Sequence, residues 1–452
     1  MTSSLTSHAC SSLSGTIDIP GDKSVSHRSL ILGGMAIGRT RVSGLLMGED
    51  VLSTLQAMRM LGVEITRSQE DGENLITIDG VGTAGFISPD RPLDLGNAGT
   101  GVRLLMGAVA GQPVTAEFTG DASLSVRPMR RITDPLEQMG AAIAYTPQKS
   151  EKGFLPVTIT GADPVLSIRY DTAVASAQIK SAILLAALNG RGETIVTEPH
   201  ISRDHTESML KHFGCEVEQK FLTDGRHQII LAGGQDLIAR DIIVPRDPSS
   251  AAFAMVAALI TPDSHILLPS ISMNPQRTGL ITTLLDMGGN ITIHNERIEG
   301  GEAVADLEVV SSQLKAIEVP AERAASMIDE YPILAIAAAG AQGTTYMPGV
   351  AELRVKETDR IATTAQGLAA CGVEVAETHD SLSVTGTSSI AGGATINSSH
   401  DHRIAMSFLI LGMVSANPIT VTDIETIATS FPGFHQLMNK AGADMRDGQE
   451  KH

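Results

Sequence analysis

The chain has 452 residues, which at ~150 residues per domain allows two or three domains. Hydrophobic residues make up 42% of it and charged residues only 19%, so it can bury substantial cores and wholesale disorder is excluded. Acidic residues outnumber basic ones by 51 to 33, and the net charge of −18 argues against a general nucleic-acid binder. With nine Phe, four Tyr and no Trp, the chain also offers few rings on which single-stranded bases could stack.

The cysteines and the apolar runs indicate the compartment. Cys10, Cys215 and Cys371 lie far apart, which fits a reducing compartment and disfavours a disulfide framework or a thiolate metal site. The longest apolar runs, 251–260 and 408–414, fall short of the ~18–20 residues that span a membrane. The first 15 residues lack the basic start and apolar stretch of a secretory signal, and we expect a short disordered leader there. We therefore expect a soluble, cytoplasmic protein with no membrane or nucleic-acid partner.

One phrase recurs six times along the chain: an amphipathic helical run, a glycine, and then a β-favouring residue. In the first copy Leu55, Met58 and Leu61 form the buried stripe of the helix. Glycine supplies the left-handed cap that ends a helix, and a strand is expected to follow it. Each copy is therefore a helix-and-strand module of roughly 70 residues. The glycines are Gly62, Gly140, Gly214, Gly288, Gly372 and Gly442.

Six such modules are too many for one core, because cores stop growing beyond about 250–300 residues. We expect two groups of three, joined within residues 242–253, where two prolines precede a helix start capped by Ser249 or Ser250. Two domains that meet at a hinge create a cleft, which is a usual place for a small-molecule site.

Polar clusters interrupt this apolar sequence where helices are expected to begin. In PGDKSVSHRSL, Gly21 allows a turn, Ser24 or Ser26 can cap a helix, and Lys23 and Arg28 make its start cationic, which suits an anion. A capped surface helix with solvated charges is the alternative for a lone match of this kind. Further clusters of the first half hold Asn97 and Gly99 among small residues, Arg127 before Pro128, Ser176 and Gln178 at the start of an apolar helix, and Arg203.

The second half repeats the arrangement. Asp329 and Glu330 directly precede an apolar helix, and Arg403 enters another. In ELRVKETDRIA, Lys356 and Arg360 are four residues apart and are expected to share a helix face beside Glu357. Each cluster alone could be a salt-bridged cap, but a structural need explains their repetition poorly.

Two other patterns do not carry a site. Gly80–Gly85 matches GxGxxG, but Pro89 and Pro92 exclude the helix that a dinucleotide-binding loop must open. His400 and His402 form an HxH pair that no nearby His, Cys or carboxylate cluster completes. We expect neither a metal nor a cofactor.

Taken together, the motifs resemble those of the 3-phosphoshikimate 1-carboxyvinyltransferase (EPSP synthase) family, in particular its class II branch. The resemblance runs nearly end to end, from IPGDKSVSHRSL through LGNAGTGVRL, GDASLSVRPM, SAQIKSAILLA, RDHTE, SMIDEYPILA, ELRVKETDR and DHRIAMSF to TSFPGF. It implies the enolpyruvyl-transferase fold, α/β in class and α+β in detail, with two domains of three βαβαββ units each. Residues 20–243 would form the domain that carries Lys23, Arg127 and Ser176. Residues 1–19 and 244–452, with the N-terminal strand, would form the domain that carries Asp329, Lys356 and Arg403.

The implied reaction transfers the enolpyruvyl group of phosphoenolpyruvate to the 5-hydroxyl of shikimate 3-phosphate through a non-covalent tetrahedral intermediate in a closing cleft. It belongs to the shikimate pathway, which leads to chorismate and the aromatic amino acids, and is the target of glyphosate. The substrates carry four anionic groups, which suit the seven cations at motif positions, and planar Arg forks suit carboxylate and phosphate. These cations are Lys23, Arg28, Arg127, Arg203, Lys356, Arg360 and Arg403. We expect a monomer.

The resemblance also implies residue roles. Asp329 would be the base for the 5-hydroxyl and Glu357 the acid near the enol methylene, with Lys23 reaching both substrates. The shikimate 3-phosphate residues would be Lys23, Ser24, Arg28, Ser176, Ala177, Gln178, Arg203, Asp329 and Lys356. The phosphoenolpyruvate residues would be Lys23, Asn97, Gly99, Arg127, Gln178, Arg360 and Arg403.

Two positions differ within the family. Thr429 stands where some members carry a phosphoenolpyruvate-binding Lys, and Gly99 stands where some herbicide-tolerant relatives carry Ala. The glycine leaves room for glyphosate, and Gly99→Ala is expected to weaken inhibition. Two alternatives stay open: UDP-N-acetylglucosamine 1-carboxyvinyltransferase, although its usual Cys is missing from residues 111–126, and a non-catalytic repeat scaffold.

Overall fold

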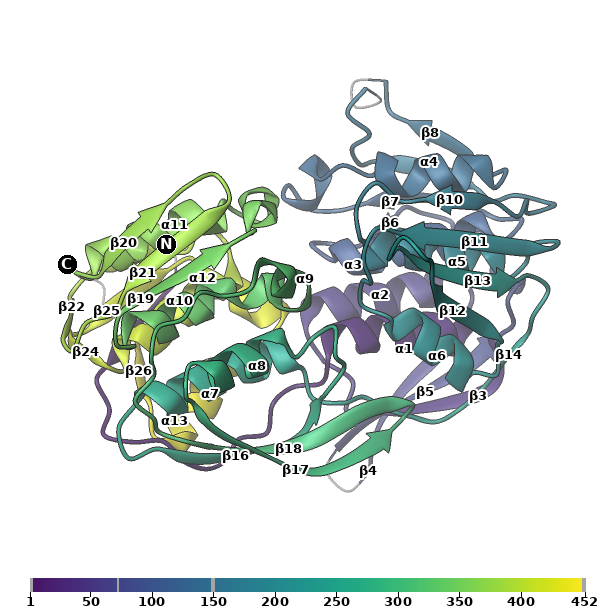
Figure 1. Cartoon of the computed structure of the whole chain (residues 1–452). Helices are drawn as coiled ribbons and strands as arrows, with labels where there is room; N and C mark the ends of the chain where they lie inside the picture. The colour runs from purple at the N-terminus through teal and green to yellow at the C-terminus, as the bar shows by residue number, and fades with distance from the viewer. Residues whose placement is uncertain (1–2, 71–72, 148–150, 449–452) are drawn as a thin grey trace. The chain divides into compact units, whose positions relative to one another are not determined.

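The computed structural model describes residues 3–70, 73–147 and 151–448 (Figure 1). By their internal contacts these residues form two compact units. Unit 1 consists of Met1–Pro20, Arg246–Ile298 and Ala303–His452, and unit 2 of Gly21–Pro245 together with Glu299–Glu302. The sequence does not predict that the short segment Glu299–Glu302 belongs to unit 2.

Unit 2 contains the first three modules. Module one has α1 (Lys23–Met35), β3 (Ala36–Ser43), α2 (Glu49–Met60), β4 (Glu64–Glu70) and β5 (Glu73–Val81), with β14 (Leu237–Ile238) and β15 (Ile242–Ile243) added to its sheet. Module two has β6 (Leu93–Asp94), α3 (Gly99–Ala110), β7 (Thr115–Thr119), the 3-10 turn η1 (Leu124–Val126), α4 (Arg130–Gln138), β8 (Ala142–Tyr145) and β9 (Val157–Thr160). Module three has β10 (Arg169–Asp171), α5 (Ala177–Ala187), β11 (Glu193–Glu198), α6 (His205–His212), β12 (Val217–Phe221) and β13 (His227–Ala232).

Unit 1 contains the other three modules. Module four has β2 (Ser14–Thr16), α7 (Pro248–Ile260), β16 (His265–Ser272), α8 (Gly279–Asp286), β17 (Asn290–Glu299) and β18 (Glu302–Val310). Module five has η2 (Ala321–Arg323), α9 (Ala324–Met327), η3 (Ile328–Glu330), α10 (Tyr331–Ala339), β19 (Thr344–Pro348), η4 (Ala351–Val355), α11 (Arg360–Ala370), β20 (Glu374–Glu377) and β21 (Ser381–Thr385). Module six has β23 (Thr395–Asn397), α12 (His402–Gly412), β25 (Ile419–Thr422), η5 (Ile424–Thr429), α13 (Phe434–Ala441), β26 (Asp444–Asp447) and β1 (Ser4–His8), and β22 (Ile390–Gly392) pairs separately with β24 (Ser415–Asn417).

The sheets of modules two and three share one pairing pattern. In module three β10 lies parallel to β11, which pairs antiparallel with β13, and β13 pairs antiparallel with β12. Module two repeats this with β6, β7, β9 and β8. Each parallel step needs a crossover helix, whereas the last two strands form a hairpin. The order strand, helix, strand, helix, strand, strand is the predicted βαβαββ unit.

The N-terminal residues are part of the fold of unit 1. β1 pairs antiparallel with both β25 and β26, and β2 pairs parallel with β16. The expectation of a disordered leader is therefore wrong. Its Ser- and Thr-rich composition conceals a two-residue period, in which Leu5 and Ser7 are buried and the alternate residues are partly exposed.

All six repeat glycines have positive φ, from 82° at Gly372 to 123° at Gly442. In the first copy the Gly62 N–H donates to the Arg59 carbonyl at 3.0 Å and the Val63 N–H donates to the Met58 carbonyl at 3.1 Å. This pair of hydrogen bonds is the Schellman motif, and the other five copies have it too. The glycine prediction is confirmed in all six modules, because each helix ends by the same backbone mechanism.

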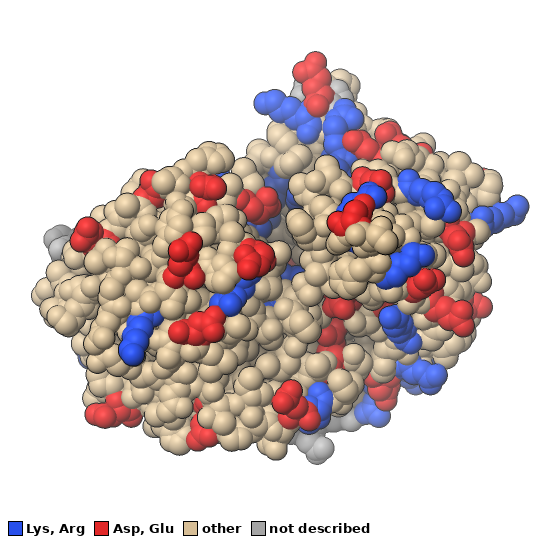
Figure 2. Space-filling view, viewed as in Figure 1, with Lys and Arg blue, Asp and Glu red and all other residues tan. Residues whose placement is uncertain are grey.

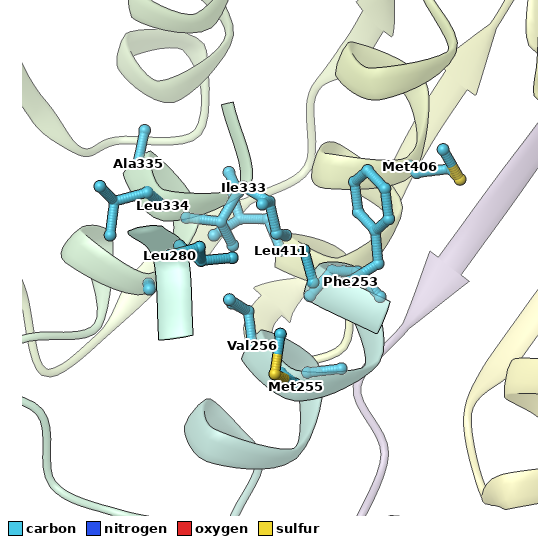
Figure 3. Packing of buried hydrophobic residues seen from close by; sticks show 14 of the residues in the cluster. Phe253, Met255, Val256, Leu280, Ile333, Leu334, Ala335, Met406 and Leu411 are labelled. Atoms are coloured by element: carbon cyan, nitrogen blue, oxygen red, sulfur yellow. The ribbon is translucent and has the colours of Figure 1, made fainter. Parts of the chain in front are cut away.

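Each unit has a core of inner helices that are buried on all sides. In unit 1 these are α7, α10 and α12, and all nine residues of α10 are buried. Figure 3 shows Phe253 and Val256 of α7 beside Ile333 of α10 and Leu411 of α12. In unit 2 the inner helices are α1, α3 and α5. A continuous apolar surface around a helix requires neighbours on every side, which three modules supply and one does not.

The surface is of mixed charge on the face drawn in Figure 2. Lys and Arg side chains are interspersed there with Asp and Glu, and neither sign forms a continuous patch among the described residues on that face. Within the described part of the chain, no helix is both long and apolar enough to cross a membrane.

Candidate active site

In unit 2, the start of α1 carries the first predicted cluster. Asp22 is the N-cap and accepts the Val25 N–H at 2.8 Å, so the expected cap at Ser24 or Ser26 is wrong. The carboxylate of Asp22 stands one residue before the helix, where it reaches the free N–H groups. Lys23 forms an ion pair with Asp50.

Arg28 lies one turn further along α1 and is buried. Its guanidinium donates to Thr206 Oγ1 at 2.7 Å, to Ser181 Oγ at 3.0 Å and back to the Ser24 carbonyl at 3.0 Å. Burial lowers the pKa of Arg28 to about 10, against the raising effect of carboxylates such as Glu207. The side chain is therefore a fixed cation that ties α1 to α5 and α6.

The starts of α3 and α5 lie next to each other. Gln178 Nε2 donates to Thr100 Oγ1 at 3.1 Å, and Arg103 Nη1 donates to Gln178 Oε1 at 2.8 Å. Arg127, whose backbone is extended before Pro128 as predicted, donates from Nη2 to Asn97 Oδ1 at 2.8 Å. Motifs some 80 residues apart are thus brought together within unit 2.

Gly99 sits between two guanidinium groups at the start of α3. A Cβ atom built on Gly99 would lie 3.1 Å from Arg127 Nη1 and 3.4 Å from Arg103 Nη1. Because Gly99 has no side chain, the guanidinium groups of Arg127 and Arg103 can occupy these positions. Arg103 was not among the residues predicted from the sequence. The feature that could have indicated it is a lone cation inside the apolar run of residues 102–110.

Ser176 is the N-cap of α5, as expected, and Ala177 is the first residue of the helix. The Ser176 N–H donates to Glu198 Oε1 at 3.1 Å. Arg203 is half-buried in the loop that precedes α6. The unit 2 cluster is defined as Lys23, Ser24, Arg28, Asn97, Gly99, Arg127, Ser176, Ala177, Gln178 and Arg203.

His27 makes the stability of this region sensitive to acid. Its ring is buried and hydrogen-bonds to Thr54 Oγ1 at 2.8 Å; burial, helped by the charges of Lys23 and Arg28, lowers its pKa to about 3. Below pH 6.5 the unfolded chain takes up a proton that the folded chain does not, so folding stability falls by up to about 1.4 kcal/mol per pH unit, down to pH 3. We expect His27→Gln to remove this slope. Urea unfolding at pH 7 and pH 5 measures it, and the same change at the exposed His379 is the control.

In unit 1, Arg360 is the centre of the second predicted cluster. Only 1% of its side chain is exposed, and its guanidinium lies 2.7 Å from Asp401, 2.6 Å from Glu357 and 3.2 Å from Asp329. Burial opposes the charge, but these three carboxylates raise the pKa of Arg360 above its ordinary value. Asp329 and Glu357, predicted from separate motifs, are joined by one cation.

Lys356 and Arg360 do not share a helix face, and this expectation is wrong. Lys356 has extended backbone after η4, whereas Arg360 is the first residue of α11 with Asp359 as N-cap. The Asp359 side chain accepts the Ala362 N–H at 3.0 Å, which starts the helix after the lysine. Lys356 Nζ nevertheless lies 3.9 Å from Asp329 Oδ1, so both cations approach the same carboxylate.

Arg403 joins this cluster from α12, whose N-cap is Asp401. Its Nη1 donates to the Asp329 carbonyl at 3.1 Å and lies 3.2 Å from Glu330 Oε1. Sequence reasoning placed Glu330 before the apolar helix but gave it no role. The unit 1 cluster is defined as Asp329, Lys356, Glu357, Arg360 and Arg403.

A second row of polar residues supports Glu330 from α7. Ser249 Oγ donates to Glu330 Oε1 at 2.5 Å, and Arg277 Nη2 donates to Ser249 Oγ at 2.8 Å and to Asp247 Oδ1 at 2.9 Å. The N-cap of α7 is Asp247, so the expected cap at Ser249 or Ser250 is also wrong. Pro248 occupies the first helical position, and this fixes the cap one residue before it.

Two further sequence observations have structural outcomes. The residues after the GxGxxG match do not open a helix: among the described residues 82–98 no helix occurs, and the next one is α3. Thr429, where some family members carry Lys, ends η5 and donates from Oγ1 to the Thr426 carbonyl at 2.7 Å.

The fold is that of the enolpyruvyl transferases. The enolpyruvyl transferase NikO from Streptomyces tendae has this fold, with a TM-score of 0.77 over 99% of both chains at 17% sequence identity. EPSP synthase from Acinetobacter baumannii is more similar, with a TM-score of 0.88 and 46% identity over 99% of this chain and 100% of that chain.

Sequence comparison identifies the family. The model of EPSP synthase (3-phosphoshikimate 1-carboxyvinyltransferase) matches residues 8–438. The 3-phosphoshikimate 1-carboxyvinyltransferase of Methylorubrum extorquens is 55% identical over 96% of both chains, and that of Parvibaculum lavamentivorans is 54% identical over 98% of this chain and 96% of its own. The chain belongs to the EPSP synthase family, and the fold class and enzyme class predicted from its sequence are confirmed.

Proposed function

We propose that this chain transfers the enolpyruvyl group of phosphoenolpyruvate to the 5-hydroxyl of shikimate 3-phosphate and releases inorganic phosphate. The observation that carries the proposal is the unit 1 cluster, in which Arg360 joins Asp329 to Glu357 and Lys356 approaches Asp329. The reaction removes one proton and adds another, and it acts on substrates with four anionic groups. A pair of carboxylates among fixed cations suits both needs.

Asp329 takes the proton of the 5-hydroxyl, and Glu357 gives a proton to the methylene carbon of phosphoenolpyruvate. Protonation makes C2 electrophilic, the 5-oxygen bonds to C2, and a tetrahedral adduct forms. The adduct then loses phosphate from C2 and a proton from the methyl group, which restores the double bond. In the second half the leaving phosphate takes the proton held by Asp329, and Glu357 takes the proton lost by the methyl group, so both carboxyl groups return to their starting state.

The cations bind the two substrates. For shikimate 3-phosphate we assign Lys23, Ser24, Arg28, Ser176, Ala177, Gln178, Arg203, Asp329 and Lys356. For phosphoenolpyruvate we assign Lys23, Asn97, Gly99, Arg127, Gln178, Arg360 and Arg403. Arginine forks match carboxylate and phosphate oxygens in pairs, and Arg127 and Arg360 are already held in place by protein contacts.

A turnover assay tests the proposal. The purified chain is incubated with phosphoenolpyruvate and either shikimate 3-phosphate or UDP-N-acetylglucosamine, and released phosphate is measured. We expect phosphate to be released when shikimate 3-phosphate is the acceptor and not when UDP-N-acetylglucosamine is. Release with the sugar nucleotide would assign the chain to the alternative reaction, and release with neither would leave a non-catalytic scaffold.

Gly99→Ala is expected to weaken binding of both phosphoenolpyruvate and glyphosate. The new methyl group would stand 3.1 Å from Arg127 Nη1, closer than ordinary contact, and would have to displace this guanidinium or the ligand beside it. Inhibition constants for glyphosate and KM for phosphoenolpyruvate measure the effect. Gly340→Ala, where the nearest atom would be 3.9 Å away, is the control. Unchanged inhibition in Gly99→Ala would contradict the steric argument.

A further inference from the structure

A buried ionic group in unit 2 has no part in the chemistry above. Lys180 of α5, Glu198 at the end of β11 and Glu207 of α6 have fully buried side chains. Lys180 Nζ lies 3.0 Å from Glu198 Oε2 and 2.7 Å from Glu207 Oε1. Buried ion pairs often contribute little net stability, because desolvation offsets their attraction. The hydrogen bonds of each carboxylate therefore indicate its role better than its ion pair with Lys180 does.

Glu198 connects two segments of the unit 2 cluster. Its Oε1 accepts the Ser176 N–H at 3.1 Å and the Ser202 hydroxyl at 2.6 Å, and its Oε2 accepts the Ser202 N–H at 3.4 Å. Lys180 Nζ adds a hydrogen bond to the Ser202 carbonyl at 3.3 Å. One carboxylate thus holds both the N-cap of α5 and the residue that precedes Arg203.

The charges allow Glu198 to do this beside an anion. Burial opposes its ionisation, but contacts with His227, Lys180 and Ser202 lower the pKa of Glu198 to about 2, so it accepts hydrogen bonds at neutral pH. The Lys180 ammonium, 3.0 Å from Glu198 Oε2, offsets part of the repulsion between this carboxylate and a bound phosphate. Glu207 differs: burial raises its pKa, and its contact is with Lys180.

We propose that Glu198, held by Lys180, is a positioning residue for the phosphate group of the acceptor substrate. It fixes Ser176 relative to the loop that carries Arg203, so that the hydroxyl, the first N–H groups of α5 and the guanidinium are arranged before the phosphate arrives. A site arranged in advance binds more tightly, because less freedom is lost on binding. This inference rests on the proposed function, since it takes Ser176 and Arg203 to bind shikimate 3-phosphate.

Two matched variants test it. Glu198→Gln and Glu207→Gln each remove one negative charge next to Lys180, but only Glu198 contacts Ser176 and Ser202. We expect Glu198→Gln to raise KM and the calorimetric Kd for shikimate 3-phosphate about 10- to 100-fold, as loss of a charged hydrogen bond does, with kcat and KM for phosphoenolpyruvate nearly unchanged. Glu207→Gln is expected to lower Tm without changing either KM.

The outcomes separate the two levels of the proposal. A wild-type chain that does not turn over shikimate 3-phosphate overturns the proposed function. If the wild type is active and the two Gln variants have the same KM for shikimate 3-phosphate, the role of Glu198 is overturned but the proposed function is not. If Glu198→Gln does not fold, Ser202→Ala decides, because it removes only the 2.6 Å hydrogen bond. A raised Kd for shikimate 3-phosphate in that variant supports the role, and an unchanged Kd contradicts it.

Discussion

Asp329→Asn is expected to lower kcat by about 10²–10⁴-fold, the usual contribution of a general acid–base group. The amide keeps the shape of the side chain but cannot take the 5-hydroxyl proton. Arg360 retains Asp401 and Glu357 as partners, so the fold of unit 1 should survive. Steady-state release of phosphate measures kcat, and thermal unfolding measures stability.

The control for this variant lies in the same ion-pair group. Glu352 Oε1 is 3.8 Å from Lys356 Nζ, almost the distance at which Asp329 stands, but 60% of the Glu352 side chain is exposed. Glu352→Gln should therefore leave kcat near the wild-type value. Equal loss of kcat in the two variants would mean that Asp329 acts only through the charge of Lys356. A wild-type kcat in Asp329→Asn would show that Asp329 does not transfer the proton.

Arg360→Met is expected to lower the free energy of unfolding by about 3–5 kcal/mol, in addition to abolishing turnover. The change removes the cation that the buried Asp401 and the partly exposed Asp329 and Glu357 share, and leaves all three carboxylates without it. Methionine is of similar length and stays compatible with burial. Urea unfolding measures the loss.

Arg354→Met is the matched control. Arg354 also pairs with two carboxylates, Asp359 and Glu377, but at the protein surface, where solvent screens the interaction. Its replacement should change stability far less. If the two variants lose equal stability, burial of Arg360 is not the cause. If neither variant loses stability, the three carboxylates around Arg360 are neutralised by other groups.

Patterns that depend on neighbours in the chain were predictable. The six glycines ended their helices as expected, since a left-handed residue at the end of a helix is a local property of the backbone. Arg127 was predicted to be extended from Pro128 alone. The chemical types needed for the proposed reaction were also visible, as cations and carboxylates at helix starts.

The errors occurred where several local solutions were possible. Serines were expected to cap α1 and α7, but Asp22 and Asp247 cap them, because more than one capping residue preceded each helix. Composition suggested a disordered leader at Ser4–His8, and only the family resemblance implied a strand there, because its partners, β25 and β26, lie more than 400 residues away in the sequence. A strand at one end of the chain cannot show its hydrogen bonds in its own composition.

The amino-acid sequence by itself determined the number of modules, the ends of their helices and the family, because these depend on short motifs and backbone preferences. Only the tertiary structure decided that Arg360 touches three carboxylates, that Arg103 reaches Gln178 and that Glu198 joins Ser176 to Ser202. These contacts join residues up to about 75 positions apart, and packing of the inner helices sets their distances. Side-chain identity records what a residue can do, whereas long-range packing decides which partner it meets.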